Sequence, residues 1–363
     1  MAYIAPTTKS TGTLITAAIW NADVVANEIA IYAGGLSIAS QATGDVIVAS
    51  SATQLGRVAP STSGNVLTST GSAWASAAPS NQVAPSQCDH RLTLTSGLAV
   101  TTANVTGAST IYLTPYKGKS VSLYTGSAWV VYTVAELSIA TSGGTASKPH
   151  DVFLDENGGT PALAILTWTN TTTRATALTV QDGVLVKTGD TSQRYMGTVY
   201  LDSSKNCDDS LTFRSVWNYY NRVARPMQAF EPADSWTYTI ATWRYSRGNA
   251  ANALWFVIGV SEDQVDASAQ ALATNGQANV GIYSGIGLDS SSAVTVGTST
   301  RGWLGPVASH YMGLNSEYHG FPGIGNHQIT WLEKSEATNT TTWLGDVGQP
   351  ADFQTGIQGT ILG

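Results

Sequence analysis

The chain has 363 residues, enough for two domains, and only 11% are charged, against about 25% in typical soluble domains. Its net charge is −7 and no basic block occurs, which excludes the usual pattern of a nucleic-acid-binding protein. Long solvated helices need charged outer faces, so this Gly-, Ser- and Thr-rich composition favours short strands joined by tight turns.

Nothing in the sequence predicts a secreted or membrane-spanning chain. The first residues, MAYIAPTTKSTG, lack the charged and apolar regions of a signal peptide. The longest apolar run, residues 253–260, is too short to cross a bilayer. Cys88 and Cys207 are too few for a disulfide framework, and the sequence leaves open whether they pair. We therefore expect synthesis in a reducing cytoplasm and no membrane partner.

One helix is predicted close to the N-terminus, over residues 17–33. Thr16 can cap its first turn, and Gly34 and Gly35 end it. Apolar residues recur within it at spacings of 4, 3, 4 and 3: Ala18, Ala22, Val25, Ile29 and Tyr32. This heptad-like pattern fits a short coiled coil, and it also fits an amphipathic helix that packs on its own chain.

Residues 36–86 are predicted to form a Ser/Thr/Gly-rich stalk. The segment contains an internal repeat: GDVIVASSATQL begins at residue 44 and GNVLTSTGSAWA at residue 64, 20 residues later. Both begin with Gly, Asp or Asn, Val and a branched aliphatic residue, continue with small polar residues and end on a large apolar one. Such a period predicts a small repeated β unit that cannot bury its apolar face alone. The large apolar residues here are too few to offset the entropy of ordering the chain. We therefore expect other copies of the chain, or a larger assembly, to order the stalk.

The pentapeptide TGSAW occurs in the stalk at residues 70–74 and again at residues 125–129. In both places we expect a hairpin turn, made by Gly71 and Gly126. The second copy is followed by the apolar run VVYT, so its strands can join a core. The first copy lacks such a core, and we expect Trp74 to find its contacts on neighbouring chains.

A β-sandwich domain is predicted over residues 87–227. Its strand-like runs cover residues 111–113, 120–124, 129–133, 151–154, 162–168 and 184–187. Hairpin turns are predicted at ENGG (156–159) and QDG (181–183), where the residues tolerate positive φ. We expect Pro226 to end regular structure in this domain.

A second, jelly-roll-like β-sandwich is predicted over residues 228–363. Its strand-like runs cover residues 236–245, 253–260, 280–288, 307–313 and 328–334. We expect one short helix here, over residues 266–276, capped by Asp266 and ended by Gly276. The predicted fold is thus mainly β: an N-terminal helix and extended stalk followed by two antiparallel sandwiches.

Several groups of residues invite a catalytic or metal-binding interpretation, and each also has a simpler one. Glu317, His319 and His327 fit no dedicated metal motif and can be ordinary loop residues. Cys88, Asp89 and His90 could include a nucleophile, but alternation along a strand separates Asp89 from the other two. We predict no metal and no cofactor.

Two further patterns can be read as catalytic. The acidic run at residues 261–266 holds Glu262, Asp263 and Asp266, which could supply the two carboxylates of a glycosidase or simply cap a helix. Residues 281–289, GIYSGIGLD, are Gly-rich but lack the lysine of a phosphate-binding loop. We therefore predict that the chain is not an enzyme.

Exposed aromatic residues are the stronger candidates for a binding site, because sugar rings stack on them. Four aromatic residues lie in Gly/Pro-rich sequence that is typical of loops, where binding residues concentrate: Trp303, Tyr311, Tyr318 and Phe321. Aromatic residues also fill sandwich cores, and that interpretation suits Trp243, Trp255 and Trp331 better because they lie within strand-like runs. The four candidates could contact a sugar, a protein or a capsid.

Two groups of sequence segments resemble proteins of tailed bacteriophages. The segments TKSTGTLITAAIWNADVVANEIAIYAG, IASQATGDVIVASSATQLGRVA and GNVLTSTGSAWA resemble the virion-proximal parts of tail-fibre proteins. The segments SVSLYTGSAWVVYTVAELSIA, DVFLDENGGTPALAILTWTN, TALTVQDGVLVKTGDTSQRYMGTVY and SVWNYYNRVARPM resemble a module of phage fibre and virion surface proteins. Together they cover about residues 1–227 and contain no catalytic motif.

The resemblance implies a homotrimeric structural protein of the virion. Residues 1–35 would then anchor the chain to other virion proteins, through contact residues on the helix: Trp20, Ala22, Val25, Ile29 and Tyr32. The expected role is a tail fibre or tail spike that binds a glycan or protein of the host surface. The alternatives are a head fibre or capsid decoration protein and, from another class, a spike that degrades polysaccharide.

Overall fold

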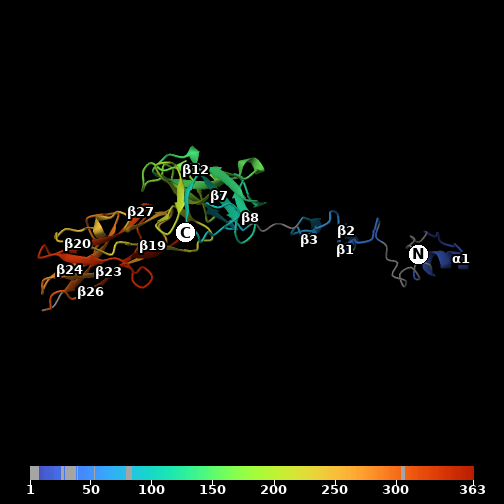
Figure 1. Cartoon of the computed structure of the whole chain (residues 1–363). Helices are drawn as coiled ribbons and strands as arrows, with labels where there is room; N and C mark the ends of the chain where they lie inside the picture. Colours follow the sequence, from blue (N-terminus) through green and yellow to red (C-terminus); the bar gives the residue numbers. More distant parts are fainter. Residues whose placement is uncertain are drawn as a thin grey trace. The chain divides into compact units, whose positions relative to one another are not determined.

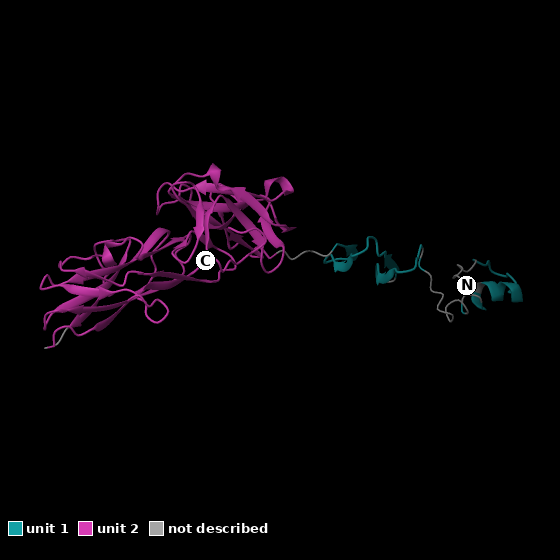
Figure 2. Ribbon diagram, viewed as in Figure 1, with its two compact units in different colours: residues 1–82 teal, residues 83–363 magenta. Residues whose placement is uncertain are grey.

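The computed structural model describes residues 8–25, 28, 38, 40–52, 54–78, 84–303 and 307–363 (Figure 1). The chain divides into two compact units, Met1–Gln82 (unit 1) and Val83–Gly363 (unit 2), which Figure 2 colours separately. The fold is mainly β, as the composition predicts. Among the described residues, no helix is long and apolar enough to cross a membrane.

The N-terminal helix begins where the sequence predicts. Helix α1 (Ala17–Trp20) is capped by Thr16, whose Oγ1 accepts a hydrogen bond from the Ile19 N–H at 3.3 Å. The chain continues as a π-helical turn over Asn21–Val25, which corrects the prediction of a regular α-helix there. A π turn is wider than an α turn, so the 4-3 spacing no longer forms one straight stripe. Ile29, Tyr32 and the predicted glycine stop lie outside the described residues.

Unit 1 contains two hairpins of the same type. Strand β1 (Val46–Ala49) pairs with β2 (Leu55–Val58), and β3 (Val66–Ser69) pairs with β4 (Trp74–Ala77), both antiparallel. The first strands of the two hairpins begin 20 residues apart, at Val46 and Val66. The internal repeat in the sequence is therefore a repeated β-hairpin.

The two hairpins also repeat a polar contact across their strands. Arg57 Nη1 binds Asp45 Oδ2 at 2.8 Å in the first hairpin. In the second, Asn65 Nδ2 donates to Ser76 Oγ at 3.2 Å, from equivalent positions. Each second-strand residue also donates to a carbonyl before its hairpin, Arg57 to Ser40 and Ser76 to Pro60. The repeat thus extends to the side-chain contacts that hold each hairpin together.

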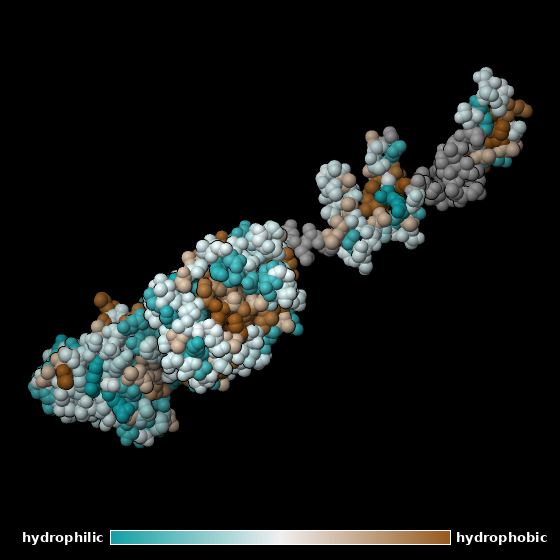
Figure 3. Space-filling view, turned by 90° about the horizontal axis from the view of Figure 1, so that it is seen from above, coloured by the Kyte–Doolittle hydropathy of each residue, from teal (hydrophilic) through white to brown (hydrophobic). Residues whose placement is uncertain are grey.

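No described residue of unit 1 is buried. Six large apolar side chains of the hairpins are each more than 40% exposed: Val46, Ile47, Leu55, Val66, Leu67 and Trp74. Figure 3 shows hydrophobic atoms on the surface of these hairpins. Strands that pair in twos and bury nothing are marginal in water, so unit 1 lacks the packing that stabilises a folded domain.

Unit 2 has two hydrophobic cores, and the first lies among strands before residue 220. A three-stranded sheet has the order β10-β7-β5, and β8 pairs with β9. Their bounds are β5 (His90–Thr93), β7 (Thr110–Pro115), β8 (Ser120–Tyr124), β9 (Trp129–Thr133) and β10 (Leu137–Ala140). The buried residues Leu113, Leu123 and Val199 belong to one cluster, so these strands pack on the sheet that contains Val199.

That sheet has the order β12-β11-β15-β14-β13, with β18 paired to β15. Its strands are β11 (Lys148–Asp155), β12 (Ala162–Thr167), β13 (Leu178–Gln181), β14 (Val184–Lys187), β15 (Asp190–Leu201) and β18 (Val216–Asn218). The predicted turns at ENGG and QDG connect neighbouring antiparallel strands. Asp182 and Gly183 both have positive φ, 51° and 85°, as a two-residue hairpin loop requires.

The second core lies mainly between an eight-stranded and a six-stranded sheet, and Phe153 and Tyr195 of the sheet above also belong to it. The eight-stranded sheet has the order β25-β24-β27-β22-β17-β16-β6, with β21 paired to β27. Its strands are β6 (Val105–Ala108), β16 (Cys207–Asp209), β17 (Phe213–Arg214), β21 (Arg244–Tyr245), β22 (Ala253–Ile258), β24 (Gly281–Leu288), β25 (Thr300–Trp303) and β27 (Gly325–Ser335). Strands from both predicted sandwiches share this sheet, so one sheet runs through both parts of unit 2.

The six-stranded sheet has the order β19-β29-β23-β28-β20, with β26 paired to β23. Its strands are β19 (Ala224–Phe230), β20 (Ser235–Tyr238), β23 (Val265–Asn275), β26 (Met312–Gly320), β28 (Thr341–Leu344) and β29 (Gly356–Leu362). Buried Phe256 and Trp331 of the opposite sheet join Ala269 and Trp343 of this one in a single core. The two sheets therefore form a β-sandwich, and the predicted boundary at residues 227/228 falls inside β19.

The predicted helix over residues 266–276 is wrong, because these residues form strand β23. Burial alternates along it: Ala267, Ala269 and Ala271 face the core, while Asp266 and Gln270 face solvent. Alanine favours helices in isolation, but here its small side chain packs between two sheets, and tertiary packing overrides the local preference.

Pro226 does not end regular structure, because it lies inside β19 and is paired in register with Thr360 of β29. Its carbonyl points away from β29 and accepts hydrogen bonds from the Arg214 guanidinium, at 2.6 Å from Nη2. The missing N–H of Pro226 therefore also faces away from β29. A proline is tolerated on an edge strand in this orientation because no ladder hydrogen bond is lost.

Two predicted strands have different bounds in the structure. Residues 236–245 are divided between β20 and β21, which belong to different sheets, so the chain crosses from one sheet to the other between them. The Tyr238 hydroxyl donates to the Thr242 carbonyl at 2.9 Å across this crossing. The strand predicted over residues 307–313 begins only at Met312 and continues to Gly320 as β26.

Candidate functional site

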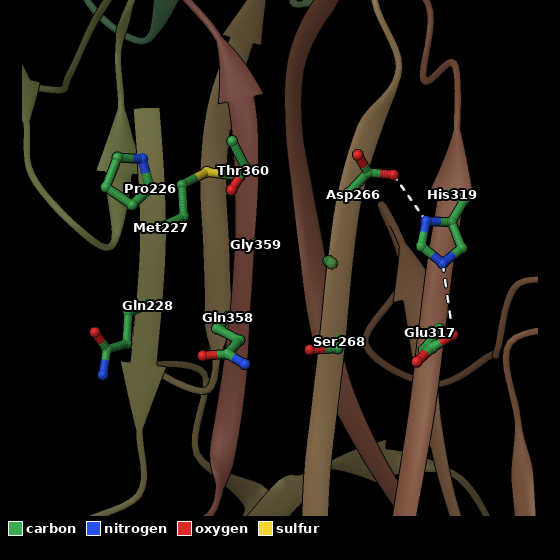
Figure 4. Close-up of a pocket in the computed structure, with 11 residues that line it drawn as sticks. Pro226, Met227, Gln228, Asp266, Ser268, Glu317, His319, Gln358, Gly359 and Thr360 are labelled. Carbon is green, nitrogen blue, oxygen red and sulfur yellow. Dashed lines mark hydrogen bonds and ion pairs between the residues drawn. The ribbon is translucent and has the colours of Figure 1, made fainter. Parts of the chain in front are cut away.

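A polar groove of about 470 Å³ lies on the outer face of the six-stranded sheet (Figure 4). Strands β19, β29, β23 and β26 lie side by side there, and their registers align two rows of outward side chains. The first row is Pro226, Thr360, Asp266 and His319, and the second is Gln228, Gln358, Ser268 and Glu317. Alternation along the strands produces the rows, since Tyr318 and Ser316 face the core while their neighbours face the groove.

Three titratable side chains form a cluster at the β26 side of the groove. His319 Nδ1 lies 2.7 Å from Asp266 Oδ1, and His319 Nε2 lies 3.5 Å from Glu317 Oε2. The hydrogen bonds with Asp266 and Glu317 raise the pKa of His319 above its usual value. Hydrogen bonds from Gln264 and His319 lower the pKa of Asp266. The imidazole thus lies between two carboxylates beside the groove.

A second groove continues along strands β23 and β26. It is lined by Gln270 and Leu272 of β23, by Gly313 and Asn315 of β26, and by Phe353 from the loop before β29. Ser268 and Glu317 of the first groove are the next outward residues to Gln270 and Asn315 of the second. Outward positions from residue 266 to residue 272 cover about 20 Å of strand, because each residue adds about 3.3 Å. The two grooves therefore follow one another along β23 and β26, the first lined largely by polar side chains and the second also by Leu272 and Phe353.

The cluster does not have the arrangement of a catalytic site. Both ring nitrogens of His319 face carboxylates, and Ser268 is in register with Glu317 and not with His319. A general acid needs a raised pKa, whereas the pKa of Asp266 is lowered. The arrangement is suited to hydrogen bonding with a ligand.

The predicted cluster of Glu317, His319 and His327 does not converge. His327 lies on β27 of the other sheet, is only 3% exposed, and its Nδ1 is 2.8 Å from Asp289 Oδ2. In the part of the chain that the structure describes, no group of three or more His, Cys, Asp or Glu side chains could hold a metal ion. Sequence proximity within EYHGFPGIGNH is misleading because residues 321–324 connect strands of opposite sheets.

The Cys88–Asp89–His90 segment is structural. Cys88 and Cys207 are both buried and free, and burial raises the pKa of each thiol, which disfavours the reactive thiolate. His90 is buried with its Nε2 3.0 Å from the Val134 carbonyl. Asp89 accepts a hydrogen bond from the Ser120 N–H at 3.0 Å and so fixes the start of β8.

The other two catalytic interpretations also end in structural roles. Glu262 and Asp263 are both paired with Arg222. The Gly-rich residues 281–288 form strand β24, and a side chain at Gly285 would collide with Val294 and approach Trp243. Glycine is required there because another segment packs directly on the strand, with no phosphate involved.

The structure separates the four predicted binding aromatics. Trp303, Tyr311 and Phe321 are each at least half exposed. Tyr318 is only 6% exposed and belongs to the core of the sandwich, so its predicted role is wrong. Tyr318 lies in strand β26, where alternation turns it inward. None of the four lines the polar grooves.

Sequence reasoning missed a partly exposed group of aromatic and cationic side chains on strands β24, β25 and β27, with Trp243 beside them. The Arg301 guanidinium lies 4.5 Å from the centroid of the Trp303 ring and 5.3 Å from that of Tyr283. Lys334 Nζ lies 4.4 Å from the Tyr283 ring centroid and 5.3 Å from that of Trp243. Tyr283 is in register with Arg301 and Lys334 on its two neighbouring strands, and such cross-strand pairs are not visible without the strand pairing.

Comparisons with known proteins identify no relative. No protein-family model matches the chain. No curated protein sequence matches it. The solved structures that it matches include the insecticidal delta-endotoxin Cry8Ea1 from Bacillus thuringiensis, with 6% identity over 76% of this chain and 51% of that chain, at a TM-score of 0.24.

Two further matches are equally weak. A Bacillus thuringiensis Cry1Da tryptic core variant shares 7% identity over 70% of this chain and 48% of that one, at a TM-score of 0.19. Infectious bursal disease virus, Gx strain, shares 11% identity over 75% of both chains, at a TM-score of 0.20. The chain spans about half the length of the two toxin chains. At these TM-scores the matches carry no argument about fold or function.

Proposed function

We propose that this chain is a structural protein of a tailed-bacteriophage virion, a tail fibre or tail spike that contacts the host surface. Unit 1 would attach to other virion proteins, and unit 2 would carry the receptor contact. The observation that supports this most is the contrast in burial: no described residue of unit 1 is buried, whereas unit 2 has two cores. A chain with this division needs a partner at its N-terminal end.

The partner that we propose for unit 1 includes two further copies of the chain. Equivalent apolar positions of its two hairpins, Val46 with Val66 and Ile47 with Leu67, recur every 20 residues and are all exposed. Neighbouring copies in parallel would cover both hairpins with the same set of contacts. Three parallel copies would also present three receptor sites, so avidity would exceed the affinity of one site.

The same exposed hairpins also favour a second candidate, a head fibre or capsid decoration protein whose N-terminal unit grips the shell. In that case the apolar side chains of unit 1 would be covered by shell proteins. The two candidates place the protein at different positions on the particle.

Locating the protein on the virion tests both candidates. Labelling of unit 2 in electron micrographs of whole particles should show it at the tail for a fibre or spike, and regular labelling over the shell would favour the decoration role. Analytical ultracentrifugation of the full chain should give a trimer, and a stable monomer at micromolar concentration would count against it. Incubation with host polysaccharide should leave chain lengths unchanged; shortened chains would indicate an enzyme.

A further inference from the structure

We propose that the joined grooves along β23 and β26 bind one linear chain of neutral sugars, with the Asp266–His319–Glu317 cluster as a subsite for sugar hydroxyls. This inference rests on the proposed role of unit 2 in contacting the host surface, and it names the surface and the ligand class. The exposed aromatic residues predicted from sequence lie outside these grooves, so the site is a different one.

The shape of the surface fits an extended ligand. Outward residues on β23 continue from Asp266 through Ser268 and Gln270 to Leu272, which is about 20 Å of strand. Gly313 is in register with Leu272, and a Cβ added at Gly313 would meet no atom within 4 Å. The far end of the groove is therefore open, and a polymer can continue beyond it.

The charges favour a neutral ligand over an acidic one. The lining residues of the two grooves include the carboxylates of Asp266 and Glu317 and no Lys or Arg, within the described chain. A uronic acid, sialic acid or phosphate would meet two carboxylates with one imidazole as their only cationic partner. Hydroxyl groups, in contrast, can donate to carboxylates and exchange hydrogen bonds with the amides of Gln228 and Gln358.

The cluster holds one acceptor atom ready for such hydroxyls. Gln264 Nε2 and His319 Nδ1 both bind Asp266 Oδ1, at 2.6 and 2.7 Å. Figure 4 shows the second oxygen of Asp266 directed away from His319. A hydrogen bond from a sugar hydroxyl to this carboxylate is charge-assisted, and its two existing partners at Oδ1 restrain the Asp266 side chain.

An apolar contact is offered at the other end of the surface. Phe353 lines the second groove together with Leu272 and Gly313, and is partly exposed. Aromatic rings pack on the C–H face of a sugar, so Phe353 supplies the second half of the amphipathic contact that a pyranose needs. Hydrogen bonding at Asp266 and packing at Phe353 together define the two ends of one binding surface.

Calorimetric titration of the full-length chain tests the ligand class. The probes are linear tetrasaccharides of glucose, galactose, mannose and N-acetylglucosamine, together with a tetrasaccharide of galacturonic acid and an unstructured uncharged peptide of similar length. We expect at least one neutral tetrasaccharide to bind at least about tenfold more tightly than the acidic one. Tighter binding of the acidic sugar or of the peptide, or no binding of any neutral sugar, would overturn the proposal.

A matched pair of variants tests the surface. Ser268→Trp fills the junction of the grooves, whereas Thr342→Trp places the same side chain on the same outer face of the sheet, on β28 and outside both grooves. We expect Ser268→Trp to weaken sugar binding at least about tenfold and Thr342→Trp to leave it unchanged. Asp266→Asn, which conserves size, should weaken binding while unit 2 still melts in one cooperative transition, and equal affinity in all three variants would contradict the assignment.

Host-cell binding by the same variants separates this inference from the proposed function. Loss of cell binding in Ser268→Trp alone would support both. Cell binding that persists in Ser268→Trp would show that another surface carries the contact, while the proposed function stands. Absence of cell binding by the unmodified chain would count against the proposed function itself.

Discussion

The two TGSAW hairpins are the same local structure in two different surroundings. Between β3 and β4 the Thr70 N–H donates to the Ala73 carbonyl at 2.8 Å, and between β8 and β9 Thr125 makes the equivalent bond to Ala128 at 2.9 Å. Gly71 and Gly126 have φ of 87° and 89°. The pentapeptide therefore sets the turn independently of its surroundings.

Burial is what separates the two hairpins. Val66 and Val121 occupy the same position relative to the turn, yet Val66 is 46% exposed and Val121 is fully buried. Trp74 is half exposed, whereas Trp129 packs against Tyr124, with ring centroids 5.5 Å apart, and donates from Nε1 to Asp182 at 2.8 Å. Turn chemistry thus makes a hairpin, and only the surrounding strands make it stable.

The largest expected difference appears when the two units are produced separately. Residues 83–363 should melt cooperatively, because they contain both cores. Residues 1–82 at submicromolar concentration should show no cooperative transition and no protected amides in hydrogen exchange. Calorimetry and amide exchange measure both, and protected amides in a monomeric fragment of residues 1–82 would show that unit 1 folds without a partner.

The units should also differ in their response to pH. Burial raises the pKa of Glu333 from 4.5 to about 7, partly offset by hydrogen bonds from Trp236 and Arg244. The folded state then binds more protons at Glu333 than the unfolded state does between these values, so the contribution of Glu333 to stability is greatest below pH 4.5 and falls as the pH rises through 7. The full change corresponds to at most about 3 kcal/mol.

Denaturant unfolding of unit 2 at pH 4.5 and 7.5 checks this, with Glu333→Gln as the comparison. The variant keeps the size of the side chain but does not titrate, so its stability should fall less between the two pH values. Carboxyl groups with lowered pKa values, such as Asp266 and Asp289, act below this range. An identical pH dependence in both proteins would show that Glu333 does not titrate in this window.

Truncation of the matched valines should reproduce the difference in burial. Val121→Ala removes two methyl groups from a core and should destabilise unit 2 by about 2 kcal/mol. Val66→Ala in the monomeric chain should change stability by less than about 0.5 kcal/mol. If parallel copies cover Val66, the same variant should lower the melting temperature of the oligomer, which ultracentrifugation and calorimetry together would reveal.

The smallest effect is expected at His319. Its folded-state pKa is raised by Asp266 and Glu317, so its contribution to stability is complete below the unfolded pKa and is lost as the pH rises through the folded pKa. An NMR titration of the His319 ring should show a pKa above the usual value, and Asp266→Asn should lower it. Glu317→Gln serves as the matched change on the other side of the ring and should lower the pKa less. An unchanged pKa in Asp266→Asn would contradict the geometry of the cluster.

Features that depend on neighbouring residues could be predicted from the sequence. The Asp182–Gly183 turn, the Thr16 cap and the repeated hairpins of unit 1 all follow from residues within a few positions of each other. The helix predicted over residues 266–276 was wrong because alanine suits both a helix and the buried face of a strand. The binding role predicted for Tyr318 was wrong because its strand is flanked by glycines, which are typical of loops.

The candidate site could not be predicted in the same way. Its groove is assembled from four strands that lie between residues 224 and 362, and only their registers bring Gln228, Gln358, Ser268 and Glu317 into one row. The sequence offered one signal, the alternating polar residues of NSEYH, but not the partner strands. The sequence shows that these residues are polar, but only the tertiary structure shows that they share one surface.

The edge of the six-stranded sheet at β19 bears on how the protein behaves at high concentration. An open edge strand can recruit a strand from another molecule and so start aggregation. Here Pro226 offers no N–H, its carbonyl already accepts from Arg214, and the next outward N–H, of Gln228, donates to the Leu211 carbonyl at 2.8 Å. Copies held at high local concentration would therefore be protected from joining side by side through this edge.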